Sequence, residues 1–347
     1  MTREELKIRQ ITNQHLLRDT QKLTVVRDLC GIQAQFLPNA LHSLKIRCPN
    51  FDESTFASNL VKNWTIRGTV HIFSEDDLPL FVNAQIYRSD DWTLPSFWNQ
   101  REEWALTPAR QKELSELILA ALRSGSRTRE ELKELCRADG MSVAEEASMF
   151  HPWGGGIREL CERGFMHVPV QEEKAYCLTP IFDPIPEGDA KLELARRYFT
   201  HIAPATIHDA MYFFRATAAQ VKKWLSQLPV TSVECEGKTY FYIENGVQYP
   251  DTVPRCVFLA GFDQLLLGYE KKESLYLPQE HLRKIFNLAG IVMPALLLDG
   301  QITGRWKKKN HKLTVELFAP ISGREKTEIE QTAQGLWGES IRIDFKE

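Results

Sequence analysis

Apolar residues recur at helical spacing through the middle of the chain. The clearest case is residues 108–123 ("PARQKELSELILAALR"), which begin with a proline at the first helical position and follow Thr107 as an N-cap residue. A second helix is predicted from Thr128, because Glu131 follows it at the spacing of a capping box, and this helix stops before Gly140. The pattern therefore predicts two consecutive amphipathic helices.

The next two segments complete a supersecondary pattern. A third helix is predicted through "GGGIRELCERG" and ends at Gly164. Residues 165–180 ("FMHVPVQEEKAYCLTP") contain two short extended stretches around a polar turn, which is typical of a β-hairpin. Three helices followed by a hairpin are the layout of a winged helix, so residues 108–188 are predicted to form one.

The same order of elements recurs on both sides of this segment. Downstream, a hairpin with Gly237 in its turn follows three helical segments, "AKLELARRYFTHI", "PATIHDAMYFFRA" and "TAAQVKKWLSQL". Upstream, helices are predicted near 14–18, across 21–32 and across 52–63, and the extended stretch "WTIRGTVHIF" follows them. The sequence therefore predicts three tandem winged helices, at residues 1–107, 108–188 and 189–254.

The last ninety or so residues have a different texture. Strand-like runs at 255–268, 295–309, 312–320 and 340–346 are separated by glycine, charge or proline, and one helix is predicted around 323–335. A small C-terminal β-barrel or sheet domain at residues 255–347 fits this pattern. The predicted fold class is α+β.

Composition limits the class of protein. At 347 residues, 43% hydrophobic and 26% charged, the chain has the profile of an ordinary globular protein with more than one core. Its seven cysteines include no C-x-x-C pair, which argues against a disulfide framework and a zinc site and indicates a reducing, cytoplasmic setting. The N-terminus lacks an apolar signal region, and the most hydrophobic run, "AGIVMPALLLD", is broken by Pro294, so no membrane association is expected.

Nucleic acid is the expected partner, because winged helices mostly act on it. The net charge of −3 does not decide the matter, since binding needs a basic face and not a basic total. One basic cluster stands around a predicted turn, with Trp306 able to pack or stack: Arg305, Lys307, Lys308, Lys309 and Lys312. The alternative reading of this cluster is a solvated hairpin turn.

Three other stretches carry candidate residues for DNA or lesion binding. Trp64, Arg67 and His71 lie on or beside a predicted strand, either as core residues with Arg67 paired to a buried carboxylate and His71 hydrogen-bonded at the strand edge, or as parts of a lesion pocket. His151 and Trp153 precede three glycines that either present backbone N–H groups to a phosphate or form a flexible turn. Asp263 is read as a structural cap.

Two glutamines in "CGIQAQFLPNAL" are the most unusual chemical feature. Gln33 and Gln35 stand at the end of a predicted helix, where side chains two residues apart point about 200° apart. Pro38 disfavours helical geometry at Leu37 and encourages the chain to unwind, which lets both amides face one side. A carboxamide cannot take up a full proton, but it can orient a water molecule and face developing positive charge.

Five stretches in order resemble the winged-helix DNA glycosylases of the AlkZ and YcaQ type. They are "GIQAQ", "WTIRGTVHIFSEDDL", "APAT", "GFDQLLLG" and "LLLDGQITGRW", and the resemblance spans about residues 10 to 318. It implies three tandem winged helices with a C-terminal β-barrel and an activity that excises alkylated purines, including bases in interstrand crosslinks. The active-site motif of that family is Gln-x-Gln in the AlkZ branch and Gln-x-Asp in the YcaQ branch.

The resemblance implies that Gln33 and Gln35 are the catalytic residues of a monofunctional DNA glycosylase, in DNA repair or self-resistance. Cleavage of an ordinary N-glycosidic bond calls for a general acid or a strong base, so neutral amides suit N7- or N3-alkylated purines, which already carry positive charge. No cofactor or metal is implied, and a monomer acting on double-stranded DNA is expected. The small Ala34 between the glutamines departs from the bulkier residue expected there.

Two other functions are left open by the sequence. An inert winged-helix transcriptional regulator would bind DNA and leave its bases in place. A protein-binding scaffold would show no salt-dependent affinity for DNA.

Overall fold

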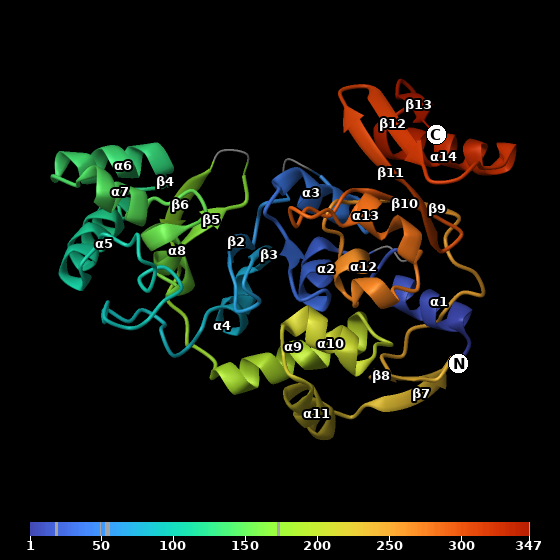
Figure 1. The fold of residues 1–347 in the computed structure, drawn as a ribbon, viewed down its shortest axis with the longest axis horizontal. Helices are drawn as coiled ribbons and strands as arrows, with labels where there is room; N and C mark the ends of the chain where they lie inside the picture. Colours follow the sequence, from blue (N-terminus) through green and yellow to red (C-terminus); the bar gives the residue numbers. More distant parts are fainter. Residues whose placement is uncertain (18–19, 49, 53–55, 172–173, 347) are drawn as a thin grey trace. The chain divides into compact units, whose positions relative to one another are not determined.

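The protein is a mixed α+β chain in two compact units (Figure 1). The computed structural model describes residues 1–17, 20–48, 50–52, 56–171 and 174–346. One unit combines Met1–Asp52 with Leu194–Glu347, and the other is Glu53–Glu193. The division into three winged helices and a C-terminal domain stays a prediction.

The unit Glu53–Glu193 contains the predicted middle helices and hairpin. Its helices are α4 (Leu78–Phe81), α5 (Pro108–Leu122), α6 (Arg129–Ala138), α7 (Val143–Met149) and α8 (Gly155–Glu162), with a 3-10 turn η1 (Glu75–Asp77) before α4. Its strands, in neighbour order β3-β2-β5-β6-β4, are Val70–Ser74, Leu60–Trp64, Met166–Pro169, Ala175–Leu178 and Arg127–Thr128. The helices predicted from Pro108 and Thr128 are confirmed, and the Thr128–Glu131 capping box is present. Helix α7 was not predicted.

The helix predicted across 52–63 is wrong. Residues 53–55 lie outside the described part of the chain, and residues 60–63 belong to β2, which pairs antiparallel with β3 from Leu60↔Ser74 to Trp64↔Val70. Asn59 has a φ of 60°, which is incompatible with a continuing helix. "WTIRGTVHIF" is accordingly the second half of a hairpin, with Gly68 at φ 80° in its turn.

In the other unit, the first helices differ from the prediction. Helix α1 (Arg3–Asn13) starts at a Thr2–Glu5 capping box, and α2 (Lys22–Asp28) ends where Cys30 and Gly31 take left-handed backbone angles of 55° and 80°. The helices predicted near 14–18 and across 21–32 were therefore misplaced or too long, and residues 18–19 lie outside the described part. Helix α3 (Leu37–Lys45) has Pro38 in its first turn, so the proline that was predicted to unwind a helix lies at the start of one.

The segment from α9 to β8 matches its prediction closely. Helices α9 (Glu187–His201), α10 (Ile207–Phe214) and α11 (Ala218–Gln227) precede the hairpin of β7 (Thr231–Cys235) and β8 (Lys238–Tyr242). Glu236 and Gly237 have φ values of 48° and 75°, as a two-residue turn of the mirror-image type requires. Local capping and turn chemistry fix these elements.

The C-terminal strands form an open sheet in the order β13-β12-β11-β10-β9, so the β-barrel alternative is wrong and the sheet alternative holds. The strands are β9 (Cys256–Leu259), β10 (Ala295–Leu298), β11 (Gln301–Lys309), β12 (Lys312–Leu317) and β13 (Arg342–Lys346). Helix α14 (Gly323–Trp337) covers the sheet and contributes Ile329 and Ala333 to its core. "GFDQLLLG" forms the short helix α12 (Gln264–Leu267) and not a strand, because Asp263 caps its first turn.

Short helical turns connect β9 to β10. They are η2 (Lys271–Glu273), η3 (Gln279–His281) and α13 (Leu282–Ile285). Among the described residues, no helix combines the length and the apolar character that crossing a membrane requires.

Candidate active site

The two glutamines lie on an extended stretch between α2 and α3. After Asp28 the chain reverses through Cys30 and Gly31, and the N–H of Gly31 donates to the carbonyl of Val26 at 2.7 Å. Gln33 ends the short strand β1 (Ile32–Gln33), and Gln35 follows in a bend before α3. The extended geometry needed to bring residues two apart toward one side is present at Gln33. It arises from the left-handed turn and not from unwinding at Pro38.

The two amides differ in exposure. Gln33 is half-buried and Gln35 is exposed. The Oε1 atom of Gln33 is buried and has no hydrogen-bond partner among the described residues. A buried polar atom without a partner costs about 1–3 kcal/mol. Such an atom in a folded protein calls for a specific explanation, and a substrate-facing role is one.

An aromatic pair adjoins the glutamines and was not predicted. Phe36 is 43% exposed at the N-cap position of α3, and its ring stacks on Phe262 at a centroid distance of 5.7 Å. A Cβ at Gly261 would lie 2.7 Å from Nδ2 of Asn39, so glycine allows this turn to approach α3. The only sequence signal was an aromatic residue directly after Gln35.

A fully buried ion pair fixes α3 beneath this site. Arg47 donates to both carboxylate oxygens of Asp263, at 2.9 and 2.8 Å. Arg47 also donates to the carbonyls of Gln14 and Ser43. Burial alone would raise the pKa of Asp263, but the charge and hydrogen bonds of Arg47 lower it below its usual value. The predicted capping role is confirmed, since Asp263 also accepts from the N–H of Leu265 at 3.0 Å.

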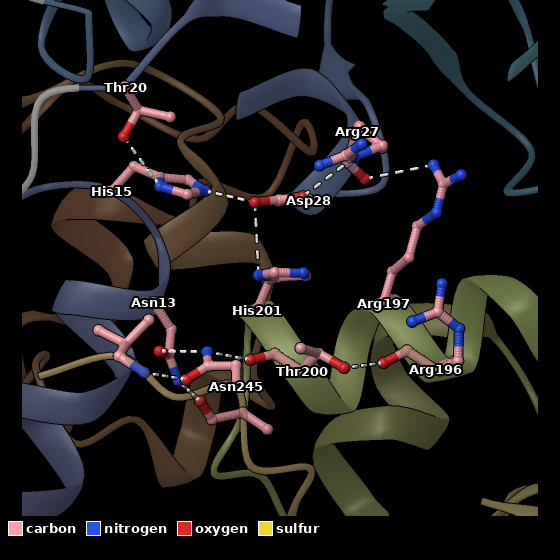
Figure 2. A network of polar contacts seen from close by, with 12 residues as sticks. Asn13, His15, Thr20, Arg27, Asp28, Arg196, Arg197, Thr200, His201 and Asn245 are labelled. Atoms are coloured by element: carbon pink, nitrogen blue, oxygen red, sulfur yellow. Dashed lines mark hydrogen bonds and ion pairs between the residues drawn. The ribbon is translucent and has the colours of Figure 1, made fainter. Parts of the chain in front are cut away.

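A second buried polar network lies just before the glutamines (Figure 2). Asp28 Oδ2 lies 3.0 Å from Nε2 of His15 and 3.4 Å from Nδ1 of His201. The other ring nitrogen of His15 lies 3.1 Å from the hydroxyl of Thr20, and Arg27 donates to Oδ1 of Asp28 at 3.3 Å. The sequence search for ligand clusters missed this group, because its members are far apart in the chain.

The network keeps Asp28 ionised. Burial raises the pKa of Asp28, but the hydrogen bond from His15 and the charges of His201, His15 and Arg27 outweigh it, so the pKa lies below its usual value. One donor atom each from His15, Asp28 and His201 lie within 4.8 Å of one another.

Trp64, Arg67 and His71 lie in the Glu53–Glu193 unit. Trp64 packs against the core of that unit. His71 is buried and hydrogen-bonded to the hydroxyl of Thr65 at 3.1 Å and the carbonyl of Thr69 at 3.0 Å. Arg67 is half-buried, and its backbone N–H donates to Thr65. The interpretation as core residues therefore explains the positions of Trp64 and His71. A role of the three residues in a lesion pocket stays a prediction.

His151 and Trp153 form a local turn at the start of α8. Nδ1 of His151 accepts from the N–H of Trp153 at 3.2 Å, and the Trp153 side chain is 71% exposed. The following glycines are packed, because a Cβ at Gly155 would lie 2.1 Å from the carbonyl of Ser148 and one at Gly156 would lie 2.2 Å from the sulfur of Met149. These glycines allow α8 to approach the end of α7, after a turn at Pro152 and Trp153.

The basic cluster lies on the β11–β12 hairpin. Arg305 is paired across the strands with Glu316 at 2.7 Å, whereas Lys307 and Lys308 are exposed. Trp306 packs inward, since its Nε1 donates to the carbonyl of Leu259 at 2.9 Å and its ring contacts His42. Lys307 and Lys308 remain the candidates for DNA contact.

Comparison with known proteins identifies the class. The sequence model described as DNA glycosylase AlkZ-like matches residues 26–337, so the chain belongs to the AlkZ-like family of DNA glycosylases. This membership favours an enzyme that removes bases over a transcriptional regulator.

Two matches, one of sequence and one of structure, show how close the likeness is. The chain is 28% identical over 320 residues to the interstrand DNA cross-link repair glycosylase of Streptomyces sahachiroi, and the match covers 85% of this chain and 84% of that protein. The solved structure of the Streptomyces sahachiroi DNA glycosylase AlkZ matches with a TM-score of 0.77 at 23% identity, covering 98% of this chain and 97% of that one. The second likeness shows that the two chains share a fold.

Proposed function

We propose that this DNA glycosylase hydrolyses the N-glycosidic bond of cationic N7- and N3-alkylated purines in double-stranded DNA, including purines tied into interstrand crosslinks. Gln33 and Gln35 are the catalytic residues, and the enzyme is a monomer with no lyase step. The observation that carries the proposal is the buried Oε1 of Gln33, which has no hydrogen-bond partner among the described residues, in a chain of this family. The name of the Streptomyces sahachiroi relative supports the crosslink substrate.

The amide chemistry limits what the site does. A carboxamide accepts through its oxygen and donates through its nitrogen, but it does not take up a proton at neutral pH. In the proposed reaction the sugar C1′–N bond breaks and its electron pair neutralises the departing cationic base. A water oxygen bonds to C1′ and releases its proton to solvent. The Gln33 and Gln35 oxygens orient that water and face the positive charge that develops on the sugar.

The same chemistry selects the substrate. An unmodified purine leaves as an anion unless a general acid protonates it, and neither glutamine supplies that proton. An N7- or N3-alkylated purine carries its positive charge before the enzyme binds it. Discrimination against normal bases therefore arises from the leaving group as well as from the fit of the pocket.

The proposed DNA contacts follow the winged-helix reading of the fold. The order of three helices and a hairpin from α9 to β8 supports that reading for residues 189–254. Exposed Lys307 and Lys308 are suited to phosphate contact, because neither has a carboxylate partner in the part of the chain that the structure describes, whereas Arg305 has one. The exposed Trp153 ring is suited to stacking on a base or sugar. Trp64, Arg67, His71 and His151 are proposed to shape the lesion pocket.

The test uses a duplex with one N7-methylguanine, in which base loss is read as strand cleavage at the abasic site. Wild-type protein is expected to release the base, whereas Gln33→Ala and Gln35→Ala lose most of that rate and keep DNA affinity in fluorescence anisotropy. Gln331→Ala, an exposed glutamine on α14, is the matched control and keeps full activity. Failure of the wild type to release the base at any salt concentration contradicts the proposal.

A further inference from the structure

One face of helix α9 holds the turn that leads to Gln33 (Figure 2). Leu194, Arg197 and His201 recur at helical spacing and contact three consecutive parts of that turn. The carbonyl of Leu194 lies 3.6 Å from the sulfur of Cys30, and Arg197 donates to the carbonyl of Arg27 at 3.4 Å. His201 lies 3.4 Å from the carboxylate of Asp28 and completes the row.

The end of α1 holds the same carboxylate from another element. His15 lies 3.0 Å from Oδ2 of Asp28 and is itself held by Thr20. Asp28 is 3% exposed and His15 is 2% exposed, so water competes little for these contacts. Asp28 is thus fixed between two helices and cannot move independently of either.

Two residues of this network have unfavourable left-handed backbone angles. His15 and Cys30 occupy the left-handed region, at φ 63° and 55°, just after the ends of α1 and α2. Glycine is the usual residue at such positions because it lacks a Cβ. Asp28 stands at the C-terminal end of a helix, where the macrodipole disfavours a negative charge. Side chains that make specific contacts at three unfavourable positions indicate a function.

The turn transmits the position of Asp28 to Gln33. The N–H of Cys30 donates to the carbonyl of Arg27 at 3.1 Å, and that of Gly31 to Val26 at 2.7 Å. These bonds close the turn between Asp28 and β1. A shift of the Asp28 end of α2 therefore moves the amide of Gln33.

We propose that Asp28, held between His15 and His201, is a positioning residue for Gln33. The inference rests on the proposed catalytic role of Gln33. Loss of the network shifts the amide of Gln33, so that it no longer holds the water molecule in the position from which it attacks the sugar. The rate of base release falls, and DNA affinity stays, because Asp28 and His15 are buried and offer DNA almost no surface.

A bound metal ion is the competing account of the same cluster. The geometry favours hydrogen bonds, since the His15–Asp28 distance of 3.0 Å is that of an ordinary hydrogen bond. The carboxylate already faces Arg27, and the guanidinium of Arg197 lies 3.4 Å from the carbonyl of Arg27. A divalent cation would add to this positive charge.

The test compares full-length variants in single turnover on the N7-methylguanine duplex, with anisotropy for affinity and thermal unfolding for folding. Asp28→Asn keeps the shape of the side chain and removes its charge, and we expect a rate roughly 10- to 100-fold lower with affinity within about twofold. His201→Ala is expected to slow the reaction similarly, and His201→Gln, which restores an N–H donor, to recover part of it. His208→Ala, an exposed histidine on α10, is the control and stays at the wild-type rate.

Several outcomes overturn the inference. The positioning role is excluded if Asp28→Asn and His201→Ala react at the wild-type rate while Gln33→Ala is inactive. That result leaves the proposed function intact. Gln33→Ala at the wild-type rate contradicts the proposed function itself. A parallel loss of affinity, or stoichiometric zinc in the wild type that His201→Ala lacks, also overturns it. If Asp28→Asn does not fold, the His201 variants decide, because that side chain is 22% exposed.

Discussion

Removal of the carboxylate of Asp263 tests the energetic role of the buried ion pair. Arg47 and Asp263 both have fully buried side chains, and two hydrogen bonds of 2.9 and 2.8 Å join them. Asp263→Ala leaves a buried guanidinium without its counter-charge, a change that typically costs about 3–5 kcal/mol. The same substitution removes the cap of α12, which is worth about 1 kcal/mol.

The expected loss for Asp263→Ala is about 5 kcal/mol of unfolding free energy, measured by urea denaturation with tryptophan fluorescence. Asp263→Asn keeps an acceptor for the Leu265 N–H and is expected to lose about 3 kcal/mol. Arg47→Met combined with Asp263→Asn is expected to lose less than the two single changes together, because neither buried group is then left alone. A loss below about 1 kcal/mol for Asp263→Ala would refute the reasoning, since only a solvent-screened pair is worth so little.

Two further predictions concern other parts of the chain. Burial raises the pKa of Glu159 to about 7, although the hydrogen bond that Gln111 donates to its carboxylate lowers it. The folded state therefore holds a proton that the unfolded state releases near pH 4.5. The free energy of unfolding therefore falls by about 3 kcal/mol as pH rises from 4.5 through about 7. Glu159→Gln is expected to remove this loss, as measured by urea titrations at about pH 5 and about pH 8.5. Lys307→Ala with Lys308→Ala is expected to reduce the slope of log affinity against log salt by about 2, and an unchanged slope excludes both from phosphate contact.

Elements fixed by local chemistry could be predicted from the sequence. The predicted capping box at Thr128 and the turn at Gly237 each place a helix or hairpin within a residue or two of its observed position. Capping boxes at Thr206 and Thr217 likewise start α10 and α11. Their interactions join residues three or four apart, which a reading of the sequence can see.

Elements that depend on distant partners could not be predicted. Strand β2 looked helical because its stability comes from pairing with β3 and with β5, where Val61 lies opposite Pro169. Barrel closure likewise depends on whether the edge strands meet, which periodicity does not reveal. The extended geometry around Gln33 was predicted, but from Pro38, whereas the left-handed turn at Cys30 and Gly31 produces it.

The buried networks were the least visible features. Asp263 was read as a cap, but its pairing with Arg47 joins segments 216 residues apart. His15 follows α1, Asp28 ends α2 and His201 ends α9, and nothing in their spacing marks them as a group.

The central claim is that neutral amides suffice because the leaving base is already cationic. It is tested most directly by single-turnover excision from two duplexes of identical sequence, one with N7-methylguanine and the other with 7-deaza-7-methylguanine, which keeps the shape and lacks the charge. We predict release of the charged base, dependent on Gln33 and Gln35, and no release of the neutral one. Equal release of both bases, or release of the charged base by the Gln33→Ala/Gln35→Ala variant at the wild-type rate, would contradict the account.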